Sequence, residues 1–263
     1  MPLLRISCPL AILLAALTPA VAQEAEPPEQ PTAEQSQLDF ANGLFSRGFF
    51  EQAAEEYATY IETYPQGAHL ATAWRRLGEA AYASGRYEKA LEAFEHLHAS
   101  APDDETHTYA ALNRGEVLYH LGRLDEAAEA LETLTQGKLS PEVHARALYY
   151  LGKAYADADK PGEALAPLRT LTEALPESPL APYARYQLAF VHLARDDLEN
   201  ATIEFSAVAN SDADAALRME SRYRAAETYD EIGWFSTAVG AYQELREEFP
   251  DSEYAQRADY GYA

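Results

Sequence analysis

Cysteine and basic residues are scarce in this chain of 263 residues. The single cysteine is Cys8, so no disulfide can form within the chain and no group of thiolates can bind zinc or an iron–sulfur cluster. Lysine and arginine number 20 against 43 aspartate and glutamate residues, which gives a formal charge of −23 at pH 7. Nucleic acids and anionic lipid surfaces are normally bound by a basic patch. The charge therefore argues against both as general partners.

Long apolar runs are lacking as well, since the run over residues 9–17 is too short to cross a bilayer as a helix. This run lies between Arg5 and the Ala-Val-Ala of residues 20–22, a small-x-small pattern that signal peptidases accept. We expect an exported bacterial protein, cleaved before Gln23 and located in the periplasm or at the outer membrane, with an uncleaved anchor as the alternative. Cys8 lacks the preceding residues of a lipoprotein signal, so no lipidation is expected there.

The next residues, 23–31, read QEAEPPEQP and contain no aromatic or β-branched side chain, as is typical of a solvated linker. Thr32 and Gln35 form a capping-box pattern, which predicts the start of the first helix. The predicted organisation is a signal peptide over residues 1–22, a disordered acidic linker over residues 23–32 and a helical repeat domain over residues 33–263. No membrane span is expected once the signal is removed.

The strongest pattern in the sequence is a repeat of 37 residues. An alanine recurs at this spacing without a gap at Ala53, Ala90, Ala127, Ala164, Ala201 and Ala238. Small residues recur at Ala41, Gly78, Gly115, Gly152, Ala189 and Ala226. Turn-forming residues recur at Gly48, Gly85, Gly122, Asp159, Asp196 and Gly233. Six copies in one register predict a regular array of structural repeats.

Each copy predicts a pair of antiparallel helices, because apolar residues at helical spacing are interrupted by a Gly or Asp that ends the first helix. Prolines such as Pro65, Pro176 and Pro250 close second helices. Asp104, Ser178 and Ser252 are predicted caps of the following first helices. The small residues mark the closest approaches between helices. The predicted fold is all-α, a right-handed α-solenoid of helix pairs.

One copy has Trp74, Leu77, Gly78 and Ala81 in its predicted first helix, Ala90 and Phe94 in its second, and Pro102 after the second. This copy resembles the tetratricopeptide repeat. The resemblance covers residues 34–263. The family's usual period is 34 residues, so the longer period here implies first helices about one turn longer than usual. Repeats of this length, with joints such as Tyr-Pro-Gln-Gly at residues 64–67, resemble those of bacterial envelope proteins, among them the outer-membrane-assembly lipoprotein and the periplasmic coordinator of cell division.

The chain ends at the opening of a seventh repeat, because Tyr260 and Ala263 stand 37 residues after Tyr223 and Ala226. A solenoid normally ends in a polar cap. We therefore expect either a continuation of the protein beyond residue 263 or a short terminal capping helix. Self-association through an uncapped C-terminal end is a further expectation.

The family binds partner peptides or helices on the inner surface formed by its first helices, and the resemblance implies such a surface here. Its best-defined peptide clamp is absent, since the matching positions hold Leu38, Asn42, Arg75 and Glu79. Tyrosine and arginine suit recognition instead. The predicted partner-binding residues are Arg75, Tyr109, Arg146, Tyr149, Tyr183, Arg185, Tyr186 and Tyr223. The alternative is that the tyrosines only pack between repeats.

No catalytic, cofactor or metal site is predicted. The seven histidines lack ligand spacing, and the carboxylates occur in runs typical of solvated helix faces. The sequence therefore predicts a non-catalytic scaffold of the cell envelope that binds a protein or peptide. The alternative is the recognition arm of a larger envelope enzyme with its catalytic domain beyond residue 263.

Overall fold

The computed structural model describes residues 32–101 and 103–260, without the side chains of the last two. The predicted signal peptide, most of the predicted linker, and residues 102 and 261–263 lie outside the described residues. The helices are α1 (Ala33–Ser46), α2 (Phe50–Thr63), α3 (Leu70–Ala83), α4 (Tyr87–Ala99), α5 (Asp104–His120), α6 (Leu124–Thr135), α7 (Pro141–Asp157), α8 (Pro161–Ala174), α9 (Ala181–Leu193), α10 (Leu198–Ala209), α11 (Ala215–Ile232), α12 (Phe235–Glu248) and α13 (Glu253–Tyr260).

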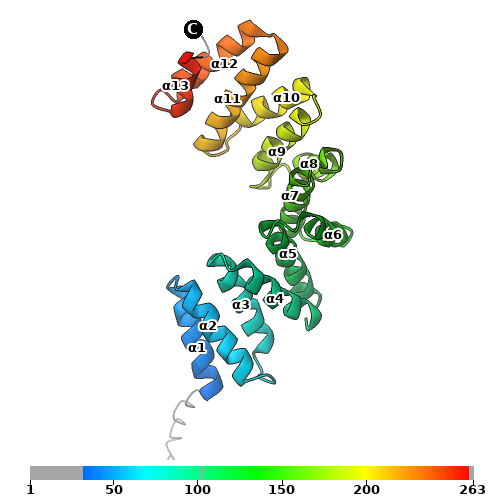
Figure 1. Ribbon diagram of the computed structural model, residues 1–263, viewed down its shortest axis with the longest axis vertical. Coiled ribbons are helices and arrows are strands. Elements are labelled where there is room, and N and C mark those ends of the chain that lie inside the picture. The colour runs from blue at the N-terminus through cyan, green and yellow to red at the C-terminus, as the bar shows by residue number, and fades with distance from the viewer. Residues whose placement is uncertain (1–31, 102, 261–263) are drawn as a thin grey trace, which may run out of the picture.

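The helices follow one another along a curved stack, so that segments far apart in sequence do not meet (Figure 1). Each helix packs on the next one in the chain, and α7 also packs on the neighbouring first helices α5 and α9. Within the described residues every regular element is a helix. The prediction of an all-α solenoid of antiparallel helix pairs is confirmed.

The turns inside the hairpins lie at the predicted positions. Gly48, Gly85, Gly122 and Gly233 have φ between 73° and 90°, and Asp159 and Asp196 have φ of 58° and 59°. A left-handed residue lets the chain leave the first helix and form the closing hydrogen bonds, and glycine adopts this conformation without steric cost. After Gly122, for example, the amide of Arg123 donates to the carbonyl of Leu118 over 3.0 Å.

The small residues mark the closest helix contacts, as predicted. A Cβ atom added to Gly78 would lie 2.6 Å from the ring of Phe94, and one added to Gly115 would lie 2.6 Å from Leu131. At Gly152 the distance to Leu168 would be 2.4 Å. Each contact joins the first and second helix of one hairpin. The recurring alanines from Ala53 to Ala238 are buried in the same way.

The start of the first helix follows the capping prediction only in part. The hydroxyl of Thr32 accepts a hydrogen bond from the amide of Gln35 at 3.1 Å, but the Gln35 side chain donates to Asp39 and does not return to Thr32. Ser252 accepts from the amide of Ala255, as predicted for a cap.

Two other caps were predicted wrongly. The N-cap of α5 is Asp103, whose carboxylate accepts from the amide of Thr106 at 2.7 Å, so Asp104 lies one residue inside the helix. The N-cap of α9 is Leu180, and Ser178 lies two residues before it. The extra residues of the repeat lengthen α5, α7 and α11 to 17 or 18 residues. The helices α3 and α9 have only 14 and 13 residues, and there the extra residues lengthen the connection that precedes the helix.

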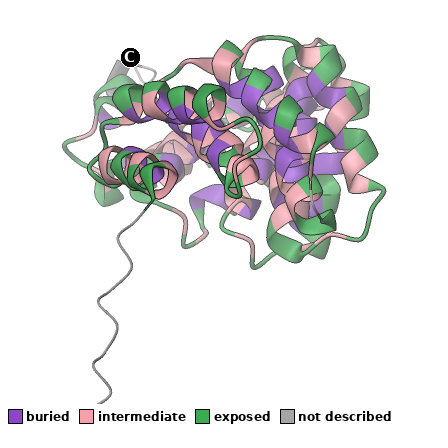
Figure 2. Cartoon of the chain, turned by 90° about the horizontal axis from the view of Figure 1, so that it is seen from below, coloured by how far each residue is buried: buried purple, intermediate pink, exposed green. Residues whose placement is uncertain are grey.

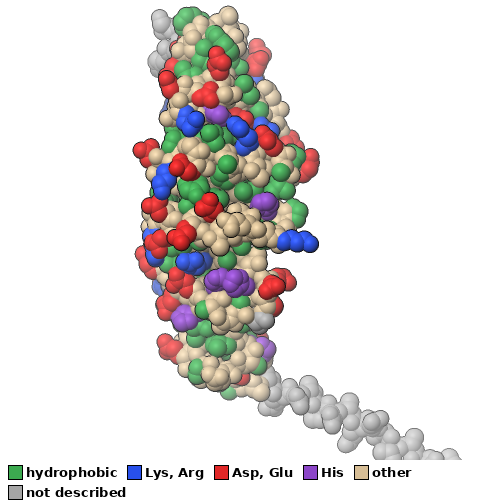
Figure 3. All heavy atoms as spheres, turned by 90° about the vertical axis from the view of Figure 1, so that its right-hand side faces the viewer, with side chains coloured by type: hydrophobic (Ala, Val, Ile, Leu, Met, Phe, Trp, Pro, Cys, Tyr) green, Lys and Arg blue, Asp and Glu red, His purple; other side chains and the backbone are tan. Residues whose placement is uncertain are grey.

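The core is distributed along the stack. Buried residues lie on the helix sides that face other helices, and exposed residues lie on the outward sides (Figure 2). On the side that carries α6, acidic side chains extend along the length of the stack with basic ones interspersed among them (Figure 3). Among the helices that the structure describes, none has the length and apolar character required to cross a membrane.

Candidate functional site

The first helices of the central and C-terminal hairpins form the inner side of the bend. In Figure 1, α5, α7, α9 and α11 lie inside the curve and α6, α8, α10 and α12 lie outside it. Residues three or four apart in a helix share a face, so one stripe of each first helix faces inward. These four helices carry all the tyrosines that the sequence predicts to bind a partner.

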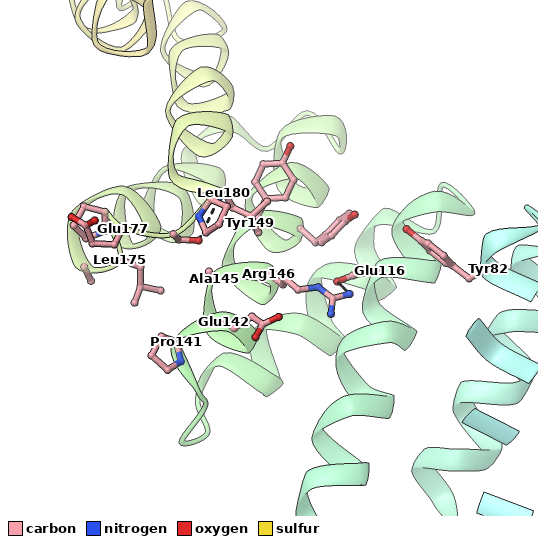
Figure 4. A pocket seen from close by; sticks show the side chains of 15 residues that line it. Tyr82, Glu116, Pro141, Glu142, Ala145, Arg146, Tyr149, Leu175, Glu177 and Leu180 are labelled. Atoms are coloured by element: carbon pink, nitrogen blue, oxygen red, sulfur yellow. Dashed lines mark hydrogen bonds and ion pairs between the residues drawn. The ribbon is translucent and has the colours of Figure 1, made fainter. Parts of the chain in front are cut away.

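A cavity of about 940 Å³ opens at α7. It is lined by one face of α7, by residues 174–180 and by Tyr82 and Glu116 (Figure 4). We call this space the α7 cavity. Its α7 face includes Glu142, Ala145 and Tyr149, whose spacing places them on one side of the helix.

The connection between α8 and α9 forms one wall of the α7 cavity. The helix α8 ends at Ala174, and Pro176 cannot continue its hydrogen-bond ladder. The amide of Ser178 then donates to the carbonyl of Leu175 at 3.0 Å, and the amide of Leu180 donates to the Ser178 hydroxyl at 3.2 Å. These bonds hold the connection in a compact turn beside α7.

A charged pair lies inside the α7 cavity. Glu116 is only 3% exposed, and its Oε1 lies 2.7 Å from Nη2 of Arg146 (Figure 4). Burial raises the pKa of Glu116, and the positive charge of Arg146 limits that rise. Because Arg146 is paired with Glu116, its charge is already compensated within the molecule.

Aromatic rings surround this pair. Tyr149 and Tyr150 make an edge-to-face contact with ring centroids 5.5 Å apart, and Tyr150 contacts Tyr119 in the same manner at 5.6 Å. The Tyr82 hydroxyl lies 2.9 Å from Nε2 of His120. Burial, followed by the nearby charge of Lys153, lowers the pKa of His120. These contacts form a continuous chain of aromatic rings across the first helices α3, α5 and α7.

The structure places only two of the predicted binding residues, Arg146 and Tyr149, in the α7 cavity. Two others form a separate cluster on α3 and α5. The guanidinium of Arg75 lies 4.1 Å from the ring centroid of Tyr109, and both side chains bind Glu79 Oε1, at 3.0 Å and 2.7 Å respectively. This cluster satisfies its own charges and hydrogen bonds.

Tyr183 and Arg185 lie on α9, outside the cavity lining. The Tyr183 hydroxyl donates to Asp214 at 2.7 Å, and Tyr183 is 39% exposed. Arg185 pairs with Glu204 of α10 at 2.9 Å, so this guanidinium binds within its own hairpin.

Tyr186 and Tyr223 are half-buried among other aromatic rings. Tyr186 contacts Phe190 and Phe205 at centroid distances of 4.9 and 5.7 Å. Tyr223 contacts Tyr254 at 5.1 Å and Tyr242 at 5.9 Å. The predicted groove centred on Tyr149, Tyr186 and Tyr223 is thus divided, and its last two tyrosines pack against neighbouring helices.

Sequence reasoning missed Tyr82, Glu116, Tyr150 and the wall over residues 174–180. The sequence did contain a signal for Glu116. Glu79 and Glu116 are one repeat apart, and each directly follows one of the recurring small residues, Gly78 and Gly115. Both carboxylates bind an arginine of a first helix. The wall carries no comparable signal, since its position depends on the path of the connection after α8.

Two of the seven histidines meet between α4 and α5. His98 and His107 have ring centroids 3.8 Å apart and line a cavity of about 650 Å³ with Arg114 and Glu126. Burial and the neighbouring His107 lower the pKa of His98. In the described part of the chain, no three His, Cys, Asp or Glu side chains are grouped as metal ligands.

Comparison with solved structures gives matches to several helical-repeat proteins. PilF of Pseudomonas aeruginosa matches at 20% identity and a TM-score of 0.60, over 87% of this chain and 97% of PilF. PilW, described as a widely conserved type IV pilus biogenesis factor, matches at 19% identity and a TM-score of 0.62, over 87% of this chain and 99% of PilW. YrrB, described as a protein with an unusual peptide-binding site, matches at 21% identity and a TM-score of 0.56, over 79% of this chain and 99% of YrrB. At these identities the likeness concerns the fold.

Comparison with curated proteins gives no match. Three family models do match, and each is described as a tetratricopeptide repeat. They match residues 38–105, 81–145 and 220–252, which include the hairpins α3–α4 and α5–α6 and most of the hairpin α11–α12. Together with the 37-residue register and the stacked helix pairs, these matches establish that the chain belongs to the tetratricopeptide repeat family.

Proposed function

We propose that this protein is a non-catalytic interaction scaffold of the bacterial cell envelope, and that it holds a segment of a partner polypeptide in the α7 cavity. Tetratricopeptide repeats are interaction modules, and the family assignment supports a role in binding other proteins. The matched families are all repeat families, and none of them points to the alternative of an arm of a larger enzyme.

The observation that carries the proposal is the lining of the α7 cavity. Rings of Tyr82, Tyr149 and Tyr150 and the side chains of Leu175 and Leu180 offer apolar surface, with a few polar groups among them. Concave sites of this volume and composition are typical binding sites. Tyrosines also lose little conformational freedom on binding, and their hydroxyls can bind a partner's backbone.

The envelope setting rests on the export signal predicted over residues 1–22. The similarity in fold to PilW, a pilus biogenesis factor, agrees with this setting. We expect protein isolated from the periplasm to begin at Gln23, as measured by intact mass. Full-length protein that begins at Met1 and remains in the cytoplasm would contradict the proposed location.

Site-specific photo-crosslinking in cells tests the binding site. A crosslinker at Ser178, in the wall of the α7 cavity, should give a discrete protein adduct. The same crosslinker at Ile203, which is 61% exposed on α10, should not give that adduct. The same products at both positions, or none at Ser178, would refute binding in the α7 cavity.

A pair of tyrosine variants on α7 provides the matched control. Tyr149→Ala removes a ring from the cavity and should abolish the Ser178 adduct. Tyr155→Ala removes a half-buried ring that binds Glu132 outside the cavity lining and should leave the adduct in place. Circular dichroism should verify that both variants keep the helical fold.

A further inference from the structure

The charges around the α7 cavity are unbalanced. In the described part of the chain, four charged side chains line it, Glu116, Glu142, Arg146 and Glu177. Arg146 is paired with the buried Glu116. Glu142 and Glu177 are exposed, and neither has a hydrogen-bond or ion-pair partner among the residues that the structure describes. An apolar cavity with two unpaired carboxylates favours a ligand that brings positive charge.

The molecule itself shows how such an environment accommodates a cation. Arg75 lies over the ring of Tyr109 while its Nε donates to Glu79, so a guanidinium is held by an aromatic face and a carboxylate together. Lys153 lies 5.2 Å from the ring centroid of Tyr119 and 5.7 Å from that of Tyr149. Tyrosine rings and carboxylates also occur together at the α7 cavity, where Arg146 is already paired with Glu116.

The chain's own linker does not supply the missing charge. Residues 23–31 carry Glu24, Glu26 and Glu29 and no lysine or arginine. Repulsion between these glutamates and the cavity rim disfavours occupation by the linker, and the overall charge of −23 favours a basic partner over an acidic one.

We infer that the occupant of the α7 cavity is a polypeptide segment in which an arginine or lysine is flanked by apolar residues. This inference rests on the proposed function and adds the chemistry of the partner. The apolar residues of the segment cover the tyrosine rings and Leu175, and its cation is attracted by Glu142 and Glu177.

Selection of random dodecapeptides displayed on phage against the full-length chain tests this inference. The expected peptides contain an arginine or lysine between apolar residues. A synthetic copy of a selected peptide should bind about five to ten times more weakly when its basic residue is replaced by glutamine, as expected for the loss of partly exposed ion pairs. Its affinity should also fall as ionic strength rises.

Protein variants locate the effect. The double variant Glu142→Gln with Glu177→Gln should bind the parent peptide about five to ten times more weakly than the wild type does. It should bind the glutamine peptide with unchanged affinity. The change in the protein and the change in the peptide are then coupled in a double-mutant cycle. The matched control, Glu62→Gln with Glu92→Gln, removes two exposed carboxylates away from the cavity and should bind the parent peptide like the wild type.

Two other outcomes separate failure of the inference from failure of the proposed function. In the first outcome, the selected peptides lack basic residues, bind the Glu142→Gln and Glu177→Gln double variant with wild-type affinity, and fail to bind Tyr149→Ala. The cavity then binds peptides, and the inferred chemistry of the partner is wrong. If no selected peptide depends on Tyr149, both the inference and the proposed peptide site are overturned.

Discussion

At the residue scale, several tyrosine hydroxyls bind carboxylates that lie about one repeat away in sequence. Tyr109 donates to Glu79 at 2.7 Å, which joins α5 to α3. Tyr119 donates to Asp157 at 2.6 Å, which joins α5 to α7. Tyr183 donates to Asp214, the N-cap of α11. Each of these hydrogen bonds links a first helix to the next first helix along the stack or to its N-cap.

Glu79 should make stability depend on pH. Burial alone would raise its pKa, but hydrogen bonds from Tyr109 and Arg75 and the charge of Arg76 outweigh burial and lower it. A lowered pKa in the folded state adds stability above the unfolded pKa of about 4.3, and this contribution is lost as pH falls through the folded value. Glu79→Gln should therefore lower the free energy of unfolding by about 1–3 kcal/mol at pH 7 and by progressively less toward pH 3.

Urea titrations of the wild type and Glu79→Gln across this pH range provide the measurement. Glu62→Gln, a change at an exposed carboxylate without an ion-pair partner among the described residues, serves as the control and should alter stability little at pH 7. A deficit in Glu79→Gln that stays constant down to pH 3 would show that the carboxylate's charge is not its source.

At the element scale, the two helices of a hairpin are held close by their small residues. Gly115 faces Leu131 so closely that a Cβ atom would overlap the leucine side chain. Gly43 of α1, in contrast, has no heavy atom within 4 Å of an added Cβ. The same residue type therefore has a packing role in one first helix and none in another.

These two glycines predict opposite effects of one substitution. Gly115→Ala should lower the free energy of unfolding by about 1–3 kcal/mol, because the hairpin must open to accept a methyl group. Gly43→Ala should raise it by about 0.5–1 kcal/mol, because alanine restricts the unfolded chain and favours the helix. Chemical denaturation of the two variants measures both effects. Equal destabilisation would contradict the assigned contact.

At the scale of the whole molecule, contacts are limited to neighbours along the stack. The core consists of successive clusters, of which one lies in α1–α4 and another around α7–α9. Stability in such arrays is approximately a sum of repeat and interface contributions. A local defect should therefore spread only to adjacent hairpins.

Tyr57→Ala tests this locality. The Tyr57 side chain is fully buried and donates to Asn42 at 2.7 Å, so its removal should cost about 3–5 kcal/mol in the N-terminal hairpins. Hydrogen exchange followed by mass spectrometry should show loss of protection in α1–α4 and unchanged protection in α9–α12. Uniform loss along the chain would indicate a single cooperative unit.

The sequence by itself determined the repeat, because each copy must satisfy the same local requirements. Only a residue tolerant of positive φ can end the first helix, and Asp159 and Asp196 meet this requirement at the positions where other copies have glycine. Only a small residue fits where two helices touch, as at Gly78 and Gly152. These constraints act within one hairpin, so they recur in register and can be recognised without a structure.

The tertiary structure decided which inward-facing residues belong to a cavity. The period places Tyr149, Tyr186 and Tyr223 at equivalent positions, yet only Tyr149 lines the α7 cavity. Aromatic rings of neighbouring helices pack against Tyr186 and Tyr223. The connection between α8 and α9 forms the side of the cavity next to α7. Such contacts depend on side chains from different repeats and on the path of a connection, neither of which follows from the periodicity of a single helix face.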